Sequence, residues 1–132
     1  MGLKRKFFSF CFAGASGALV ELVSFNLFFI FLGFSTSKVL SLMIALSLNF
    51  MINRNITFLA KSGKITKQFI RYILVYSIAI IVNLSVSITT NSFLGPGTLN
   101  ANLATVTGIA FAIPITFLGS LYWVFWDKTH KN

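Results

Sequence analysis

The chain has 132 residues, of which 56% are hydrophobic and only 10% are charged, and its formal net charge is +9. A soluble domain of this size needs more polar surface, so the composition predicts an integral membrane protein. The basic residues fall in short clusters between long apolar runs and do not form one face of a soluble fold. We therefore exclude a nucleic-acid-binding domain.

The residues that most catalytic sites require are scarce. Glu21 and Asp127 are the only acidic residues, Cys11 is the only cysteine and His130 is the only histidine. An intrachain disulfide and a zinc cluster are therefore excluded, and hydrolysis by paired carboxylates, a serine triad or two metals is not expected. We predict that the chain is not an enzyme and needs no cofactor or metal.

Four apolar stretches each have the length of a membrane-spanning helix, about 20 residues. Helices are favoured because a helix satisfies its own backbone hydrogen bonds in lipid. The basic start and Ala13 to Ala15 are also typical of a secretory signal peptide, but the apolar run continues to Phe31, which favours a retained helix. We predict an all-α membrane four-helix bundle forming one domain over residues 1–132, with helices at about 7–31, 39–59, 69–90 and 103–126.

The charges of the loops predict an orientation. The loops at 33–37 and 92–102 carry no charge. The basic residues, apart from Arg54 and from Lys38 at the edge of the first of these loops, lie before the first span, around the middle loop and after the last span: Lys4, Arg5, Lys6, Lys61, Lys64, Lys67, Arg71, Lys128 and Lys131. The positive-inside rule then places both termini and the middle loop in the cytoplasm of a multi-pass plasma-membrane protein.

A weak internal similarity favours two repeated helix hairpins. Residues 7–58 align with residues 69–125, with Glu21 opposite Asn83 at an offset of 62. Near the end of each half the offset is 67, and it aligns Phe50 with Phe117. The longer offset fits a longer second external loop. Each half would start and end in the cytoplasm, so the repeat is parallel.

Two charged residues within the spans are candidates for function. Glu21 lies roughly 21 Å from the cytoplasmic edge, where a charge costs about 2.5–3.5 kcal/mol unless it is protonated, paired or near water. Arg54 lies roughly 8 Å below that edge, beside Asn53 and one turn from Asn49. Its guanidinium matches the geometry of a phosphate, whereas its structural alternative is to anchor the helix by reaching the interface.

The other polar and small residues of the spans follow helical stripes, which is typical of helix packing. Asn83 belongs to such a stripe, and we keep it with Lys61 as a secondary candidate for substrate contact. A direct ion pair between Glu21 and Arg54 is not expected, because their depths differ by roughly 10 Å.

The stretch "NFMINRNITF" at 49–58 closes the second span with an "NFxxNRxxxF" pattern. This pattern, the first span "FSFCFAGASGALVELVSFNLFF" and the aromatic "LYWVFWD" near the end resemble the GtrA-like membrane proteins over residues 7–126. The resemblance implies a role in cell-surface polysaccharide or teichoic acid glycosylation. It also implies contacts to phosphate or sugar at Asn49, Asn53 and Arg54. We add Glu21 as a candidate contact because a charged side chain within the membrane is energetically costly.

We therefore expect a flippase for a polyprenyl-phosphate-linked sugar, partnered by a membrane glycosyltransferase and membrane lipids and assembled as a homo-oligomer. The fourth span has Ser120-Leu121 where the second has Asn53-Arg54, which argues against a second phosphate site there. One alternative is a scaffold subunit of a glycosyltransferase that moves nothing. Another is a small multidrug-type transporter. Such transporters work as two copies inserted in opposite orientations and need a weak charge bias, whereas here all Lys and Arg residues except Lys38 fall on one side.

Overall fold

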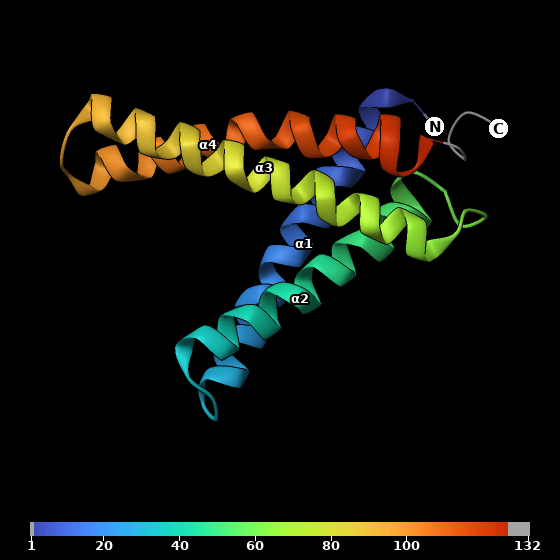
Figure 1. Cartoon of the computed structure of the whole chain (residues 1–132), viewed down its shortest axis with the longest axis horizontal. Helices are drawn as coiled ribbons and strands as arrows, with labels where there is room; N and C mark the ends of the chain where they lie inside the picture. The colour runs from blue at the N-terminus through green and yellow to red at the C-terminus, as the bar shows by residue number, and fades with distance from the viewer. Residues whose placement is uncertain (1, 127–132) are drawn as a thin grey trace. The chain divides into compact units, whose positions relative to one another are not determined.

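The computed structural model describes residues 2–126, which form helices and no strand (Figure 1). The prediction of an all-α chain is confirmed. Two short π-helices, η1 and η2, continue the second and fourth α-helices directly. The elements are α1 (Leu3–Phe29), α2 (Phe34–Ile52), η1 (Asn53–Thr57), α3 (Ile65–Leu94), α4 (Thr98–Gly119) and η2 (Ser120–Val124).

Four helical segments are long and apolar enough to cross a membrane: Leu3–Phe29, Ser35–Thr57, Ile65–Leu94 and Thr98–Val124. The prediction of four spans is therefore confirmed. The side of the membrane that each terminus faces stays a prediction. Lys128 and Lys131, which contribute to it, lie outside the described residues, as do Asp127 and His130.

The helices extend beyond most of the ends predicted from hydropathy. α1 begins at Leu3 and includes the basic residues 4–6, while α3 continues to Leu94. Helical hydrogen bonding continues through polar residues, so an apolar run marks only the lipid-facing part of a helix. The turn after α3 is set by Gly95 and Gly97, whose φ angles of +86° and +128° favour glycine.

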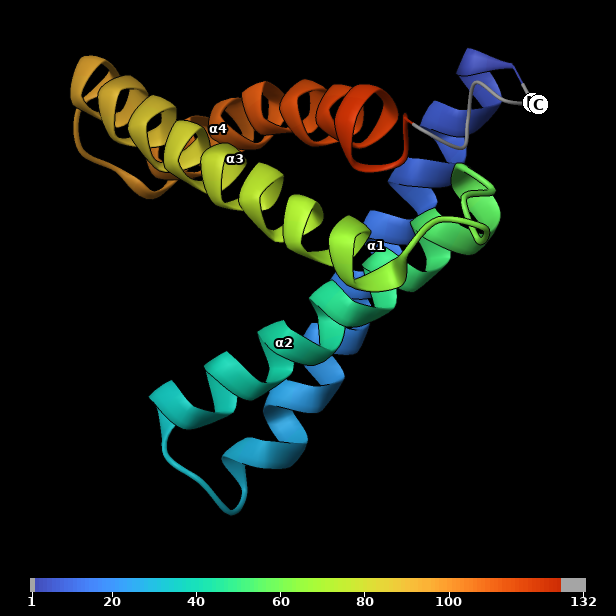
Figure 2. The same ribbon diagram turned by 45° about the vertical axis from the view of Figure 1, so that its right-hand side comes forward.

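The chain divides into two compact units between Ser62 and Gly63, and each unit is an antiparallel pair of helices. The first hairpin pairs α1 with α2, and the second pairs α3 with α4 (Figures 1 and 2). Short loops join the helices of each pair, as expected for antiparallel neighbours.

The buried faces of the two hairpins repeat along the sequence. On the first helix of each hairpin the buried residues are Phe10, Ala13 and Gly17 in α1 and Tyr72, Val75 and Ala79 in α3, each pair 62 apart. On the second helix the buried residues Ser37, Ser41, Asn49 and Phe50 correspond to Ala104, Gly108, Thr116 and Phe117, each pair 67 apart. The same offset separates η1 from η2. Burial therefore follows both offsets of the predicted repeat.

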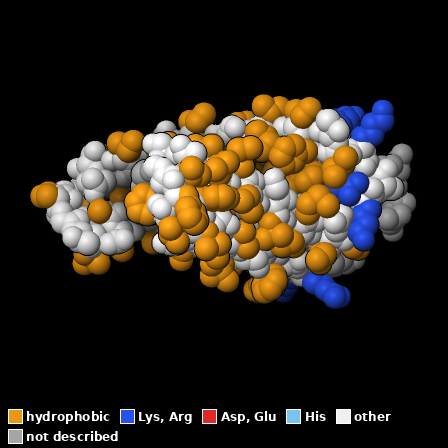
Figure 3. All heavy atoms as spheres, turned by 90° about the horizontal axis from the view of Figure 1, so that it is seen from below, with side chains coloured by type: hydrophobic (Ala, Val, Ile, Leu, Met, Phe, Trp, Pro, Cys, Tyr) orange, Lys and Arg blue, Asp and Glu red, His pale blue; other side chains and the backbone are white. Residues whose placement is uncertain are grey.

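The outward faces of the helices are apolar. Large hydrophobic side chains that are more than half exposed occur in every helix, and hydrophobic side chains cover much of the face seen in Figure 3. Examples are Phe8, Phe12, Val39, Ile81, Ile88 and Phe111. Such surfaces are unfavourable in water and are typical of contact with lipid.

Candidate substrate-binding site

Asn49 lies in α2, and the other two candidates at the end of the second span, Asn53 and Arg54, lie in the π-helix η1. Its wider turn is closed by the backbone N–H of Phe58, which donates to the carbonyl of Asn53 at 2.8 Å. Leu59 then adopts a positive φ of 51°, and the N–H of Ala60 donates to the carbonyl of Arg54 at 2.7 Å. Single π turns are frequent at functional sites because the extra residue changes the direction of the side chains around it.

A hydrogen bond ties η1 to the first helix. The hydroxyls of Ser9 in α1 and Thr57 in η1 share a hydrogen bond of 2.8 Å. Thr57 is fully buried, and Phe58 packs edge-on against Phe10 with 6.4 Å between ring centroids. The π-helix is therefore part of the packed first hairpin and not a frayed helix end.

Arg54 is half-buried at the end of this hairpin. Its Nη2 donates to the carbonyl of Lys61 at 2.6 Å, and its Nη1 donates to Oδ1 of Asn55 at 3.2 Å. These bonds hold the guanidinium at the helix C-terminus, where a positive charge is stabilised by the helix dipole. The guanidinium therefore stabilises the end of the helix.

Asn49 and Asn53 lie one helical turn apart, and both side chains are buried. Asn49 lies against Gly17 of α1, where a Cβ atom would be only 2.6 Å from its Cγ. Within residues 2–126, neither Oδ1 atom has a hydrogen-bond partner. A buried amide oxygen without a partner is costly, and in binding proteins this cost is removed when a donor from a ligand or water arrives.

Glu21 is paired, but not with Arg54. The Nζ of Lys38, near the start of α2, donates to Oε1 of Glu21 at 2.5 Å, and their side chains are 54% and 23% exposed. Glu21 is the sole acidic residue among those described, and in residues 2–126 no three His, Cys, Asp or Glu side chains gather to hold a metal. The pair explains how the first hairpin accommodates a carboxylate within a span.

The register of the hairpin separates Glu21 from the other candidates. Because Gly17 lies beside Asn49, antiparallel pairing places Glu21 level with Ala45. Arg54 is nine residues further along the second span, which corresponds to about 13 Å. The structure thus brings Asn49, Asn53 and Arg54 together at one end of the hairpin and places Glu21 toward the other.

The two secondary candidates have different surroundings. Asn83 lies in the α3–α4 interface, where its Oδ1 accepts a hydrogen bond from Ser87 at 3.2 Å and its backbone carbonyl lies close to Gly108. This is the packing role that its stripe predicts. Lys61 is exposed, and its backbone carbonyl, not its side chain, holds Arg54.

Three features of the site were missed by the sequence reasoning. The π-helix has no signal in apolar periodicity, because one extra residue shifts the stripe only slightly. Asn55 was passed over in favour of its neighbours, although it contacts Arg54. Lys38 was treated only as an exception to the charge bias, although it pairs with Glu21, the only charged residue in the second half of the first span.

The fold and the site define a small multi-pass membrane protein with a polar, cationic end on its first hairpin. The sequence model of the family described as "GtrA/DPMS, transmembrane domain" matches residues 9–130, and the chain belongs to this family. Membership confirms the resemblance seen in the sequence and relates the protein to sugar-lipid glycosylation. Neither a curated protein nor a solved structure matches the chain.

Proposed function

We propose that the protein moves a polyprenyl-phosphate-linked sugar across the plasma membrane, for glycosylation of a cell-surface polysaccharide or teichoic acid. The observation that carries this proposal is the polar end of the first hairpin, where the buried amides of Asn49 and Asn53 precede Arg54, whose guanidinium is held by the carbonyl of Lys61. Family membership supports the class of substrate.

The three parts of such a lipid suit three parts of the hairpin. The phosphate would bind Arg54 at headgroup depth through charge-assisted hydrogen bonds. Hydroxyl groups of the sugar would donate to the unsatisfied Oδ1 atoms of Asn53 and Asn49. The polyprenyl chain would lie along the exposed apolar faces. Glu21, which lies further along α1 and pairs with Lys38 of α2, would contact the sugar after it has left the Arg54 end. The proposal includes no hydrolytic step.

The bonds from Arg54 to its own chain also favour a second candidate function. A guanidinium that holds the carbonyl of Lys61 stabilises the middle loop, and this purely structural role is compatible with a scaffold subunit of a glycosyltransferase. Under that function Arg54 would serve the fold alone. An experiment must therefore separate loss of folding from loss of activity.

The test compares variants of Arg54 in cells whose surface glycosylation depends on this protein. Arg54→Ala should abolish incorporation of the sugar, while Arg54→Lys should keep part of it, because a lysine retains the charge without the bidentate geometry. Arg5→Ala removes an exposed positive charge from α1 and is the matched control, with full incorporation expected. Full incorporation in Arg54→Ala at a normal membrane level would defeat the assignment of Arg54.

A further inference from the structure

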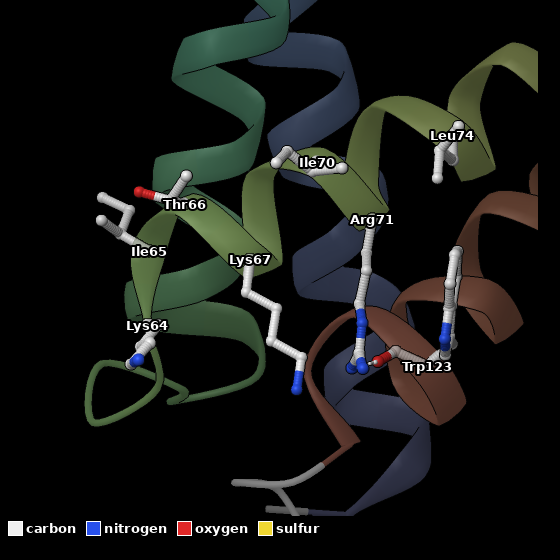
Figure 4. A pocket seen from close by; sticks show the side chains of 8 residues that line it. All are labelled: Lys64, Ile65, Thr66, Lys67, Ile70, Arg71, Leu74 and Trp123. Carbon is white, nitrogen blue, oxygen red and sulfur yellow. Dashed lines mark hydrogen bonds between the residues drawn. The ribbon is translucent and has the colours of Figure 1, made fainter.

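The second hairpin carries a basic groove that none of the candidate residues above occupies. It has a volume of about 750 Å³ and is lined by the start of α3 and by Trp123 of η2 (Figure 4). Its cationic residues are Lys64, Lys67 and Arg71. Lys67 and Arg71 are four apart and share one face of α3, and Lys64 is the N-cap residue of that helix.

Arg71 is held in place at this groove by Trp123. Its Nη1 donates to the backbone carbonyl of Trp123 at 3.0 Å, and its Cζ lies 5.4 Å from the centroid of the indole ring. Figure 4 shows Arg71 and Lys67 extending toward the same end of the hairpin. The guanidinium is therefore ordered before any ligand arrives, which lowers the cost of binding.

The described part of the second hairpin contributes no acidic side chain to the groove. Residues 63–126 contain no Asp or Glu, and Asp127, the next residue, lies outside the described residues. Three cations along about two turns of helix create a local potential that favours an anion. Basic pockets at the ends of membrane helices are typical sites for anionic headgroups.

The remaining lining is apolar and continues the groove toward the middle of the span. Ile70 and Leu74 are exposed and line it together with Ile65. From Lys64 to Leu74 the helix rises about 15 Å. A ligand with a phosphate at one end and a hydrocarbon chain at the other matches this order of cations followed by apolar side chains.

The repeat shows how the second hairpin acquires its cation. In the alignment with an offset of 62, Arg71 corresponds to Ser9. Ser9 contacts the π-helix of the first hairpin, η1, and Arg71 contacts the π-helix of the second hairpin, η2. In the first hairpin Arg54 comes instead from η1 itself. The missing Asn-Arg pair in the fourth span therefore does not leave the second hairpin without an arginine at its π-helix.

We propose that this groove binds an anionic phospholipid of the bilayer, with the headgroup phosphate held by Lys64, Lys67 and Arg71. One acyl chain lies along Ile70 and Leu74. The site goes beyond the proposed transport function, because it serves a resident lipid of the membrane and needs no movement of substrate. Its test is a binding measurement, so its failure is distinguishable from failure of transport.

Quenching of Trp123 fluorescence by brominated lipids tests the site. Trp126→Phe leaves Trp123 as the one tryptophan of the two in the chain. In vesicles with equal fractions of brominated lipid, phosphatidylglycerol should bind near Trp123 about fivefold or more tightly than phosphatidylcholine. Equal quenching by the two lipids would overturn the proposal, as would displacement by soluble glycerol phosphate, which would show a free-phosphate site.

Variants with neutral side chains show which residues cause the preference for phosphatidylglycerol. Changing Lys64, Lys67 and Arg71 together to Gln should abolish it. Arg71→Gln alone should weaken it without abolishing it, and Arg71→Lys should retain more of it than Arg71→Gln. Changing residues 4–6 together to Gln removes the same number of charges from α1 and should leave the preference intact. An equal loss in this control, or a preference that survives the groove variants, would overturn the site. Far-UV circular dichroism and elution volume verify that each variant is folded.

Discussion

Gly17 in the first hairpin and Gly108 in the second allow the paired helices to pack closely, and replacing either should lower the unfolding free energy. A Cβ atom on Gly17 would lie 2.6 Å from Cγ of Asn49, and one on Gly108 would lie 2.6 Å from the backbone carbonyl oxygen of Asn83. Comfortable contacts between such atoms are about 3.5–4.0 Å, so both methyl groups would overlap their neighbours by about 1 Å. Gly14, also in α1, has no atom within 4 Å of its Cβ position and is the matched control.

The kind of neighbour decides the size of each effect. The amide of Asn49 is a side chain and can rotate, so Gly17→Ala should cost about 1–2 kcal/mol of unfolding free energy. The carbonyl of Asn83 belongs to the backbone of α3, so Gly108→Ala must separate two helices and should cost about 3 kcal/mol. Gly14→Ala should cost nothing and gain up to about 1 kcal/mol from helix propensity.

Reversible unfolding in mixed micelles, followed by far-UV circular dichroism, measures these differences. The double variant Gly17→Ala/Asn49→Ala should recover at least half of the loss in Gly17→Ala, because the overlapping side chain is gone. Equal stability of the Gly14→Ala and Gly17→Ala proteins would show that the helices do not pack closely at Gly17. An additive double variant would refute the assigned contact between Gly17 and Asn49.

Two further predictions concern the first hairpin and the topology. Lys38→Met should lower the unfolding free energy by about 2–3 kcal/mol, because it leaves Glu21 unpaired within the span. Glu21→Gln should cost less than about 1 kcal/mol, because the half-exposed lysine can still reach the interface. Unfolding in mixed micelles measures both variants, and a larger loss in Glu21→Gln than in Lys38→Met would contradict the pairing. In a Cys11→Ser background, a cysteine introduced at Ser62 should be labelled by an impermeant maleimide only in inside-out vesicles, and labelling in intact cells would contradict a cytoplasmic middle loop.

The fold was predictable because its signals are coarse and repeated. Length and hydropathy suffice for four spans, and the glycines at 33, 95 and 97 mark the loops. The repeat was visible as the offset between Phe50 and Phe117, and both residues are buried. What hydropathy could not locate was the end of each helix, since backbone hydrogen bonding continues beyond the apolar residues that define a span.

The candidate site was predictable only in part. The sequence placed Asn49, Asn53 and Arg54 close together, because residues three to five apart on a helix stay near one another. It could not reveal that Glu21 reaches Lys38, because this contact depends on the register of two helices and the length of a lysine side chain. Nor did it reveal the groove at Arg71, because three cations on a loop edge were explained sufficiently by orientation in the membrane.

Transport of the sugar lipid can be measured by a translocation assay in proteoliposomes. The protein is reconstituted with a labelled polyprenyl-phosphate sugar, and exposure of the label on the opposite leaflet is followed over time, with Arg54→Ala and protein-free liposomes as controls. If the protein is a flippase, the label should cross only when the protein is present, and crossing should be lost in Arg54→Ala. No crossing by protein that is folded and inserted would contradict transport and favour the scaffold function.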